Sequence, residues 1–454
     1  MMSSPSHRQS LQVIILSARS SRRRRDFKQC FSRSNNRIAL SNCQHHQLAR
    51  KPITHHDVLS SRQITTSSSF PSTERTRTTT TSIEPLSSFS SSSKNNNNSK
   101  ITDLRSDTLT SPTPSMLQTA LRAPTGDDVL SEDPTVLSLE AYAASLFDKP
   151  SALFVPTGTM GNLCAILSHC HYNKSSEMIM GKHSHINLYE GGGYANLAGV
   201  SGKLVEEDED GKMDVEDLRD AFRRDDDDHY AKTVLVALEN THNMLGGVAV
   251  EKGYVDGIGR LAKDEWGGEV KIHIDGARIF NAAISLGVSV GELCEGADSV
   301  TFCLSKGLGA PMGAVLVGDQ EFIRLARRAR KKLGGGMRQA GVMAAMGMYA
   351  LENHVQRLAE DHERAKRLAS GLHDMGFWLP RGGKVDTNVV FFGLPEDSKI
   401  KKEELPHLLF EKYGVKIAGG YSSGGKLFRL VTHMDVDDEG VEKAIEGIAS
   451  LCVN

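Results

Sequence analysis

Residues 299–318 read SVTFCLSKGLGAPMGAVLVG, and this stretch decides the fold class. Its two ends, 299–304 and 313–318, are apolar runs of strand length. Between them lies Lys306, in a segment whose other residues are small or apolar. A lysine inside an apolar pattern needs a partner or a chemical role, because burying an unpaired ammonium group is costly.

Further apolar runs lie upstream, and longer amphipathic stretches separate them. These runs are residues 152–156, 233–240 and 270–275. One helical pattern begins near Asp133-Pro134, where a capping residue precedes a proline, and another follows Asp319. The alternation predicts an α/β fold with a mainly parallel sheet.

The composition divides the chain into parts. Residues 1–100 contain 12 Arg and 4 Lys against 2 Asp and 2 Glu, a balance of +12, and are rich in Ser, Thr and Asn. Such a segment buries too little apolar surface to offset its conformational entropy, so we expect it to be disordered. The remaining residues carry a balance of −14. We expect residues 101–345 to form a large α/β domain.

Residues 346–454 are predicted to form a linking helix and a small α+β domain. A long helical pattern at 341–373 leads into this part. Three strand-like runs and a closing helix follow, at 388–394, 415–420, 427–433 and 436–451.

The basic N-terminal segment has the composition of an organelle transit segment, since it is rich in Arg and Ser and poor in acids. We expect mitochondrial import ahead of plastid import, and otherwise a cytoplasmic protein. The apolar piece at 11–16 is too short to span a bilayer, and no later run reaches membrane length. The Arg run at 22–25 has no nucleic-acid recognition fold beside it, so we expect no nucleic-acid partner.

Cysteine and acidic residues give no sign of a metal site. The 7 cysteines are odd in number and form no CxxC pair, so we expect reduced core thiols, no zinc site and no disulfide framework. The acidic stretches at 206–211 and 225–228 are interpreted as solvated loops.

Three groups of chemically useful residues follow predicted strands, where open α/β sheets gather their chemistry. Gly158 and Thr159 open a helix whose free N–H groups suit a phosphate. Asp275 ends a strand and requires a cationic partner, and Lys306 is an amine that a lowered pKa would make nucleophilic. Each alone has an ordinary structural interpretation: a turn, an ion pair, a lysine reaching solvent. Together they fit the phosphate, ring nitrogen and aldehyde of pyridoxal 5′-phosphate.

Longer motifs surround these residues in order along the chain. They are DLRSDTLTSPT (103–113), GDDVLSEDPT (126–135), LFVPTGTMGN (153–162), HSHINLYEGGG (183–193), ENTHNMLGG (239–247), IHIDGARIFNA (272–282), FCLSKGLGAP (302–311), LGGGMRQAG (333–341) and FRLVTH (428–433). On these motifs the chain resembles the low-specificity L-threonine aldolases, within the aspartate-aminotransferase-like (fold type I) pyridoxal-phosphate enzymes. The resemblance runs from about Asp103 to the C-terminus.

The resemblance implies a role for each cofactor-binding residue. Lys306 would hold the cofactor through an imine, and Asp275 would keep the pyridine nitrogen protonated. Arg278 would lie near the phenolic oxygen and the substrate carboxylate. The phosphate would be held by Gly158 and Thr159. Arg338, which follows three glycines, would contact the phosphate or another part of the active site.

The resemblance also implies the residues that handle the substrate. His185 would stack on the cofactor ring and exchange a proton, and His242 is the second candidate for handling the substrate hydroxyl; which of them is the base stays open. Tyr189 would line the pocket. Ser106 and Arg429 would clamp the substrate carboxylate, which suits the arginine fork.

These roles imply cleavage of the Cα–Cβ bond of threonine, allo-threonine and related β-hydroxy-α-amino acids to glycine and an aldehyde. A homodimer or homotetramer with shared active sites is also implied. The alternatives on the same scaffold are β-elimination, transamination and racemisation. A nucleotide-dependent oxidoreductase is poorly supported because no GxGxxG motif follows a strand. An inactive homologue is opposed by the presence of Lys306 and Asp275.

One departure concerns Leu130-Ser131, which stand where the family often has Tyr-Gly. The aromatic ring usually lies near the active site. Its absence leaves the cofactor chemistry intact and puts the rate and the side-chain preference in doubt.

Overall fold

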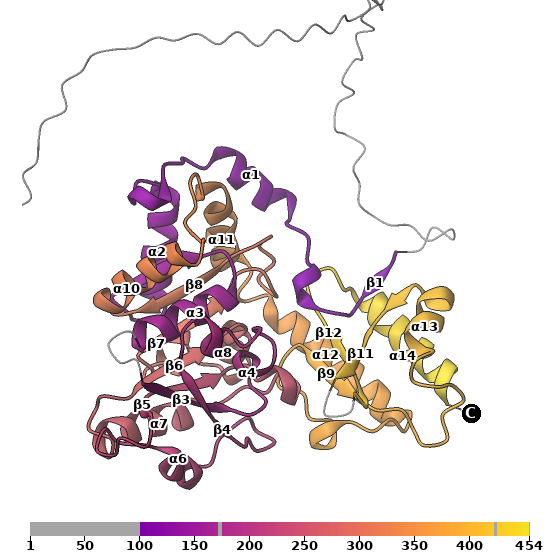
Figure 1. Cartoon of the computed structure of the whole chain (residues 1–454). Coiled ribbons are helices and arrows are strands. Elements are labelled where there is room, and N and C mark those ends of the chain that lie inside the picture. Colours follow the sequence, from indigo (N-terminus) through magenta and orange to yellow (C-terminus); the bar gives the residue numbers. More distant parts are fainter. Residues whose placement is uncertain (1–99, 171–174, 422–424, 454) are drawn as a thin grey trace, which may run out of the picture. The chain divides into compact units, whose positions relative to one another are not determined.

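The quoted stretch lies in the middle of a central sheet. A computed structural model of the chain describes residues 100–170, 175–421 and 425–453, and Figure 1 shows their arrangement. The segment expected to be disordered and to carry the targeting signal, 1–100, lies outside the described residues except for Lys100.

Seven strands form the central sheet, in the order β2-β8-β7-β6-β5-β3-β4. Their bounds are β2 Ser151–Val155, β3 Ser176–Gly181, β4 Ser201–Val205, β5 Lys232–Glu239, β6 Lys271–Asp275, β7 Ser299–Cys303 and β8 Ala314–Gly318. β8 runs antiparallel to its neighbours β2 and β7, and the other neighbouring pairs are parallel. The predicted α/β fold with a mainly parallel sheet is therefore confirmed. The two halves of the quoted stretch form one of these antiparallel pairs, β7 with β8.

The apolar runs of the sequence predict β2, β5, β6, β7 and β8 but not β3 or β4. Every residue of β7 and β8 is buried, so these strands are continuous apolar runs. β4 lies at the edge of the sheet and is mostly exposed, with the sequence SGKLV. β3 is mostly buried, but its apolar run is limited to Met178, Ile179 and Met180. An exposed strand or an apolar run this short gives little signal in a sequence.

Helices precede, connect and follow the strands of the central sheet along the chain. The longer ones are α1 Pro114–Arg122, α2 Pro134–Leu146, α3 Gly158–His169, α7 Lys252–Asp264, α8 Ile279–Leu286, α10 Gln320–Lys332, α11 Gly341–Asn353, α12 Leu358–Asp374, α13 Leu405–Tyr413 and α14 Asp438–Cys452. Shorter ones are α4 His185–Leu188, α5 Gly193–Asn196, α6 Val215–Ala221 and α9 Val290–Leu293. The described part of the chain also contains the 3-10 helices η1 Asp107–Leu109, η2 Asp128–Leu130, η3 Asn243–Leu245 and η4 Pro380–Gly383.

Both predicted helix starts are confirmed. The Asp133 carboxylate accepts from two N–H groups of the first turn of α2, and proline occupies the first helical position. The Asp319 carboxylate accepts from the N–H of Phe322 at 2.7 Å and caps α10. Each cap satisfies backbone donors that have no partner inside the helix.

Helix α3 lies close against the sheet because two of its residues have no side chain. A Cβ atom on Gly161 would stand 2.5 Å from Thr301 Cγ2, and one on Gly158 would stand 2.7 Å from Cys303 Sγ. Both distances are shorter than the non-bonded contacts that a Cβ atom makes, so a side chain at either position would force its neighbours to move. The glycines therefore hold the N-terminus of α3 beside the end of β7, which leads to Lys306.

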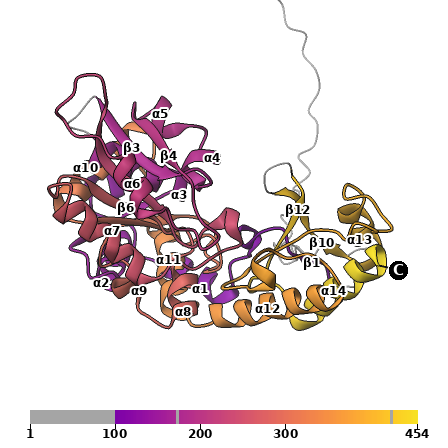
Figure 2. The same ribbon diagram turned by 90° about the horizontal axis from the view of Figure 1, so that it is seen from below.

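The helical pattern at 341–373 is two helices, α11 and α12, separated by residues 354–357. The buried ring of His354 ends α11, and its Nδ1 lies 2.8 Å from the carbonyl oxygen of Leu308. This contact redirects the chain. Figure 2 shows α12 extending from the neighbourhood of α8 to that of α14.

The C-terminal part has its own sheets and its own core. Three antiparallel strands follow the order β11-β12-β9, and two parallel strands pair as β1-β10. Their bounds are β1 Thr102–Asp103, β9 Val389–Phe392, β10 Val415–Lys416, β11 Ala418–Tyr421 and β12 Leu427–Val431. A hydrophobic cluster packs these strands against α12, α13 and α14. It includes Leu104, so the first described strand closes onto the last part of the chain.

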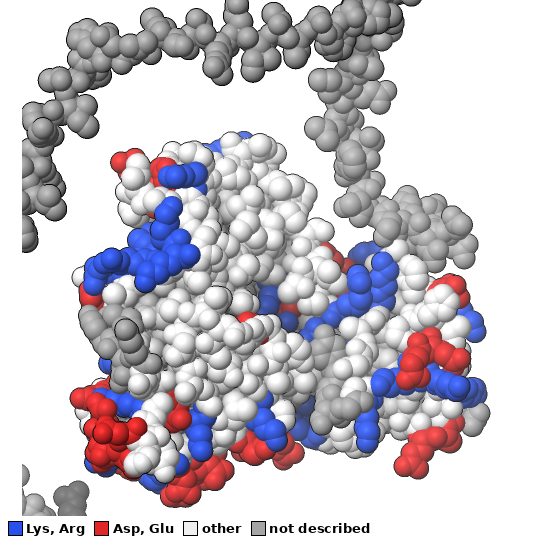
Figure 3. Space-filling view, viewed as in Figure 1, with Lys and Arg blue, Asp and Glu red and all other residues white. Residues whose placement is uncertain are grey.

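The surface agrees with several of the other expectations. Residues 225–228 are exposed, whereas the expectation of a solvated loop at 206–211 is wrong for Glu207, whose side chain is buried. Cys164, Cys170, Cys294, Cys303 and Cys452 are buried free thiols. Figure 3 shows basic side chains gathered at the upper left, acidic ones mixed with basic ones at the lower left, and both kinds over the right-hand part, with a wide uncharged area in the centre. Within the described residues, no helix combines the length and the apolar character needed to cross a membrane.

Candidate active site

A cavity opens at one edge of the central sheet and has a volume of about 220 Å³. Its lining residues are Ser106, Thr108, His185, Tyr189, Glu239, Thr241, Asn243, Asp275, Ala277, Arg278, Lys306 and Arg429. Glu239 is the last residue of β5, Asp275 is the last of β6, and Lys306 follows the end of β7. Parallel strands end at the same edge of a sheet, so the cavity occupies the position where α/β folds bind ligands.

The structure brings together most of the residues singled out in the sequence. Those that line the cavity are Ser106, His185, Tyr189, Asp275, Arg278, Lys306 and Arg429. Gly158, Thr159, His242 and Arg338 are not among its lining residues. Glu239, Thr241 and Asn243 line it although the sequence analysis chose only His242 from their motif. Along ENTHN, residues 239, 241 and 243 line the cavity and residues 240 and 242 do not. The alternation of an extended segment would therefore have indicated them.

Lys306 is half-buried in the turn after β7. Its carbonyl oxygen accepts from the N–H of Gly309 at 2.8 Å and from Thr110 Oγ1 at 3.4 Å. These bonds fix the point at which the side chain leaves the turn. Within the described residues, the ammonium group makes no hydrogen bond or ion pair of its own. It therefore remains available to a ligand.

Arg278 and Asp107 form a buried ion pair beside Lys306. Arg278 donates from Nε and Nη2 to the two carboxylate oxygens of Asp107, both at 2.7 Å. Burial alone would raise the pKa of Asp107, but Arg278, and to a smaller degree Lys306, hold that pKa well below its ordinary value. Asp107 was not predicted from the sequence. It directs Arg278 into the cavity and leaves Nη1 as the nitrogen not bonded to it.

His185 is held at two points by two carboxylates. Its backbone N–H donates to Glu239 Oε2 at 2.5 Å, and its ring Nδ1 lies 3.0 Å from Glu190 Oε1. Burial by itself would lower the pKa of His185, but the hydrogen bond to Glu190 and the charges of Asp275, Glu190 and Glu239 raise it. Its ring lies 5.5 Å from that of Tyr189, centroid to centroid.

Ligand atoms of His185, Glu190 and Asp275 lie within 4.8 Å of one another, a spacing compatible with a metal ion. However, Glu190 already accepts hydrogen bonds from His185 and from Asn162 Nδ2, the latter at 2.9 Å. We interpret the group as an acid–base cluster at the end of β6.

His242 occupies a different position from His185. It is buried, and its Nε2 lies 2.8 Å from Glu207 Oε1. Glu207 also lies 3.1 Å from Nδ1 of His183. Burial would lower the pKa of His242, but the charge of Glu239 and the bond to Glu207 raise it. The second histidine candidate is thus enclosed behind the cavity wall.

The C-terminal part supplies Arg429 from β12. Its Nη1 donates to Asn243 Oδ1 at 2.9 Å and its Nη2 to the carbonyl oxygen of Arg105 at 3.2 Å. Ser106 caps η1 by accepting from the N–H of Thr108 at 3.2 Å. Tyr189 donates its hydroxyl to Met244 Sδ at 3.1 Å. The cavity wall therefore combines residues that are distant in the sequence.

Gly158 and Thr159 begin α3 next to the strand that leads to Lys306. The hydroxyl of Thr157 caps the helix at the N–H of Met160, 3.2 Å away. A helix of this length presents partial positive charge at its N-terminus, which suits an anion. Arg338 is exposed and donates to Asp127 Oδ2 at 2.7 Å.

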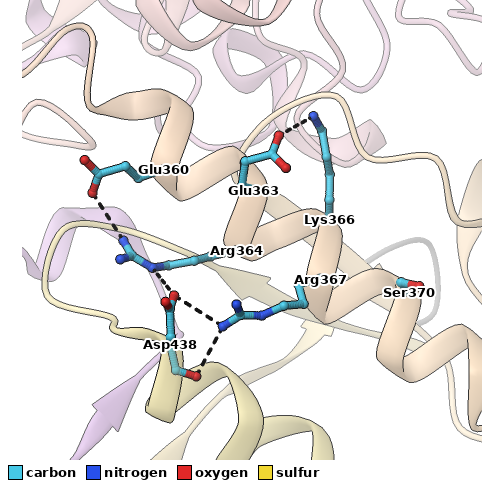
Figure 4. A pocket seen from close by; sticks show the side chains of 7 residues that line it. All are labelled: Glu360, Glu363, Arg364, Lys366, Arg367, Ser370 and Asp438. Atoms are coloured by element: carbon cyan, nitrogen blue, oxygen red, sulfur yellow. Dashed lines mark hydrogen bonds and ion pairs between the residues drawn. The ribbon is translucent and has the colours of Figure 1, made fainter.

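A larger hollow lies elsewhere, between α12 and α14, and its volume is about 630 Å³. Figure 4 shows the residues that line it, which are Glu360, Glu363, Arg364, Lys366, Arg367, Ser370 and Asp438. Its charges are paired with one another: Arg364 and Arg367 both bond Asp438, and Lys366 bonds Glu363. None of the predicted site residues lines this hollow. Its size alone does not make it a binding site.

Comparisons with known proteins agree with the geometry of the cavity. A family model described as Beta-eliminating lyase matches residues 103–394. The probable low-specificity L-threonine aldolase 2 of Arabidopsis thaliana is 44% identical over 344 residues, covering 76% of this chain and 95% of that protein. The chain belongs to the low-specificity L-threonine aldolase family. The low specificity L-threonine aldolase of Escherichia coli K12 is 40% identical over 337 residues, covering 74% of this chain and 95% of that protein.

Solved structures share the fold. The threonine aldolase of Leishmania major superposes with a TM-score of 0.65 at 19% identity and covers 77% of this chain and 99% of that chain. The threonine aldolase family and the fold class predicted from the sequence are therefore both confirmed.

Proposed function

We propose that this chain is a pyridoxal-phosphate-dependent lyase that cleaves L-threonine, L-allo-threonine and related β-hydroxy-α-amino acids to glycine and an aldehyde. The observation that carries the proposal is the presence of Lys306 and Asp275 in one cavity with His185. An amine, a carboxylate and an imidazole at neighbouring strand ends are the groups this chemistry needs.

The residues present fit the cofactor. Lys306, whose ammonium group has no hydrogen bond or ion pair within the described residues, would hold it, and Asp275 would face its ring nitrogen. The start of α3 is brought next to the end of β7 by Gly158, where any side chain would strike Cys303. Gly158 and Thr159 are the proposed phosphate-binding residues. Pyridoxal 5′-phosphate supplies an electron sink for the electron pair that bond cleavage leaves on the substrate.

Arg429 and Ser106 are the proposed ligands of the substrate carboxylate. Arg429 is held by Asn243 and by the Arg105 carbonyl, so its guanidinium group does not need to be ordered on binding. Nη1 of Arg278, which is not bonded to Asp107, can contribute to the same subsite.

His185 is the proposed base. It takes the proton of the substrate hydroxyl, the Cα–Cβ bond breaks, and the carbonyl group of the aldehyde forms. The electron pair stays with Cα, which then receives a proton and yields glycine. His242 is enclosed and bonded to Glu207, so we assign it a supporting role.

We also propose an oligomer with shared active sites. Leu121 of α1, a helix that packs against α11, is 79% exposed, and Leu130 of η2 is 63% exposed. Exposed apolar side chains of this kind favour contact with another subunit. Arg338 follows α10 and would reach a neighbouring site from there. Sedimentation analysis of wild type and Leu121→Lys tests this; a wild-type monomer contradicts it.

Two further proposals concern organisation and targeting. Residues 101–345 and 346–454 are proposed as a large and a small domain. For residues 1–100 we propose import into an organelle, with the mitochondrion favoured. A fluorescent reporter fused to these residues tests the second proposal; a reporter that stays diffuse in the cytosol contradicts it.

The activity itself is tested with purified protein and added cofactor. An absorbance scan should show the band of a lysine-bound cofactor, and each threonine stereoisomer should then release glycine and acetaldehyde. Formation of a keto acid, ammonia or the opposite enantiomer instead would favour transamination, β-elimination or racemisation.

A further inference from the structure

A continuous chain of hydrogen-bonded side chains lies beneath α3 and ends at His185. From the far end, the distances are 2.7 Å from His169 Nε2 to Ser299 Oγ, and 2.8 Å from Ser299 Oγ to His273 Nδ1. His273 Nε2 lies 3.2 Å from Asn162 Oδ1, and Asn162 Nδ2 lies 2.9 Å from Glu190 Oε1. Glu190 Oε1 then lies 3.0 Å from His185 Nδ1.

The members of the chain occupy positions that ordinarily hold apolar side chains. His273 and Ser299 face each other across β6 and β7 and are fully buried, and Asn162 on α3 is 1% exposed. Their neighbours along the strands, Ile272, Ile274 and Val300, are buried aliphatic residues. A row of buried polar groups lowers stability relative to a well-packed apolar row unless every group is bonded. Here each member has a partner on both sides from Ser299 to Glu190.

The direction of every bond follows from the chemistry of Glu190. A carboxylate can only accept, so Asn162 must turn its NH₂ group toward Glu190 and its oxygen toward His273. That oxygen can only accept as well, so His273 carries its proton on Nε2. Burial, and then the charge of His169, lower the pKa of His273 to about 3, which keeps its ring neutral. Its Nδ1 therefore accepts from the Ser299 hydroxyl, which in turn accepts from His169.

All the donors in the chain thus point toward Glu190. We propose that Glu190, with Asn162 and His273 behind it, is a positioning group that fixes His185 as the Nδ1–H tautomer and leaves Nε2 as the nitrogen that exchanges the substrate proton. The inference deepens the proposed function and rests on it. Asn162 and His273 do not line the cavity, and they act on His185 through Glu190.

Imidazole ¹⁵N chemical shifts of histidine-labelled protein test this before any substrate is added. We expect His185 to carry its proton on Nδ1 when neutral and His273 to carry it on Nε2. His354 is an internal control, because its Nδ1 faces the Leu308 carbonyl and must also be protonated. A neutral His185 protonated on Nε2, or a His273 protonated on Nδ1, overturns the proposal without any substitution.

The Asn162→Leu variant keeps a similar volume and removes the link to Glu190. We expect the single His185 tautomer to become a mixture, the His354 signals to stay unchanged, and kcat to fall about 10- to 100-fold with little change in KM. Ser168→Ala is the matched control, since Ser168 is buried on the same helix, donates to the Cys164 carbonyl at 2.6 Å and is not a member of the hydrogen-bonded chain. Equal kcat values for the two variants contradict the proposal.

If Asn162→Leu does not fold, Ser299→Ala replaces it, because this change removes one hydroxyl from the far end. The Asn162 amide oxygen can only accept, so we expect His273 to keep its proton on Nε2 and His185 to keep its proton on Nδ1 in this variant. A His273 protonated on Nδ1 contradicts the proposed bond directions. If the wild-type protein releases no acetaldehyde, the proposed function is refuted. The ¹⁵N measurement of His185 and His273 would then still test the proposed hydrogen-bonded row of side chains.

Discussion

The cavity beside Lys306 and the hollow between α12 and α14 both contain arginine, lysine and acidic residues, yet they differ in how these charges are paired. The hollow is larger, at about 630 Å³ against about 220 Å³. Its basic side chains are engaged by acids on the same surface. In the cavity, Arg278 and Arg429 are held in place from behind while Lys306 has no ionic partner within the described residues.

This difference shows that a binding site is recognised by charged side chains that are held in one position but are not fully paired with other charges. Exposed ion pairs contribute little and can rearrange in solvent. Buried groups such as Asp107 hold a functional arginine in one geometry because the pair is shielded from water. The following substitutions should therefore affect the two regions very differently.

Lys306→Ala should have the largest effect. Without the ε-amino group the cofactor has no covalent anchor, so the absorbance band and the aldolase activity should both be lost, with kcat/KM falling by at least about 10³-fold. Acetaldehyde assays with excess cofactor measure this. Turnover close to that of the wild type would show that the cavity is not the active site.

Substitution of the two histidines should change different properties: kcat for His185 and the free energy of unfolding for His242. His185→Phe should lower kcat about 10²-fold or more and leave the free energy of unfolding nearly unchanged, because this ring borders the cavity. His242→Phe should lower the free energy of unfolding by about 1–3 kcal/mol, because it leaves the buried Glu207 carboxylate without one of its donors. Denaturant titration and steady-state kinetics on both variants test the assignment. A larger loss of kcat in His242→Phe than in His185→Phe would reverse the assignment.

The pH profile should report the carboxylates around His185. Their charges and hydrogen bonds outweigh burial and raise its pKa, so the base form appears only above the ordinary value of about 6.5. kcat/KM should therefore rise with pH through that raised pKa, and Glu190→Gln should move the rising limb to lower pH. The sign for stability is opposite: the contribution of this raised pKa is present at low pH and is lost as pH rises through it. A limb that stays in place in Glu190→Gln would contradict the role of that carboxylate.

Arg367→Ala should have the smallest effect. Its partners, Asp438 and Glu442, lie on the exposed surface beside the hollow. We expect kcat/KM and Tm to match those of the wild type. A clear loss of activity would show that the hollow takes part in function after all.

The sequence predicts much of the framework because buried strands are continuous apolar runs. β7 and β8 are found for that reason, whereas the exposed edge strand β4 is missed. The break between α11 and α12 could not be predicted, since it depends on His354 meeting the carbonyl of a distant residue, Leu308.

The site was predicted unevenly for a related reason. Lys306 and Asp275 stand out because they interrupt or end apolar runs. Asp107 and Glu190 do not, because an acidic residue in a polar segment ordinarily lies on the surface, and only tertiary structure places these two beside Arg278 and His185. Glu239 ends the apolar run of β5, as Asp275 ends that of β6, and the same criterion could have selected it. Ser131 adopts a left-handed conformation with φ of 58°, which glycine would adopt with less strain. Leu130 is exposed and lies outside the cavity.

The covalent attachment of the cofactor tests the central claim most directly. Borohydride reduces a carbon–nitrogen double bond between a lysine and pyridoxal phosphate and makes the link permanent, after which mass spectrometry of peptides locates it. We predict that the wild-type protein carries the pyridoxyl group on Lys306. Labelling of a different lysine, or no labelling of protein that releases acetaldehyde from threonine, would contradict the account.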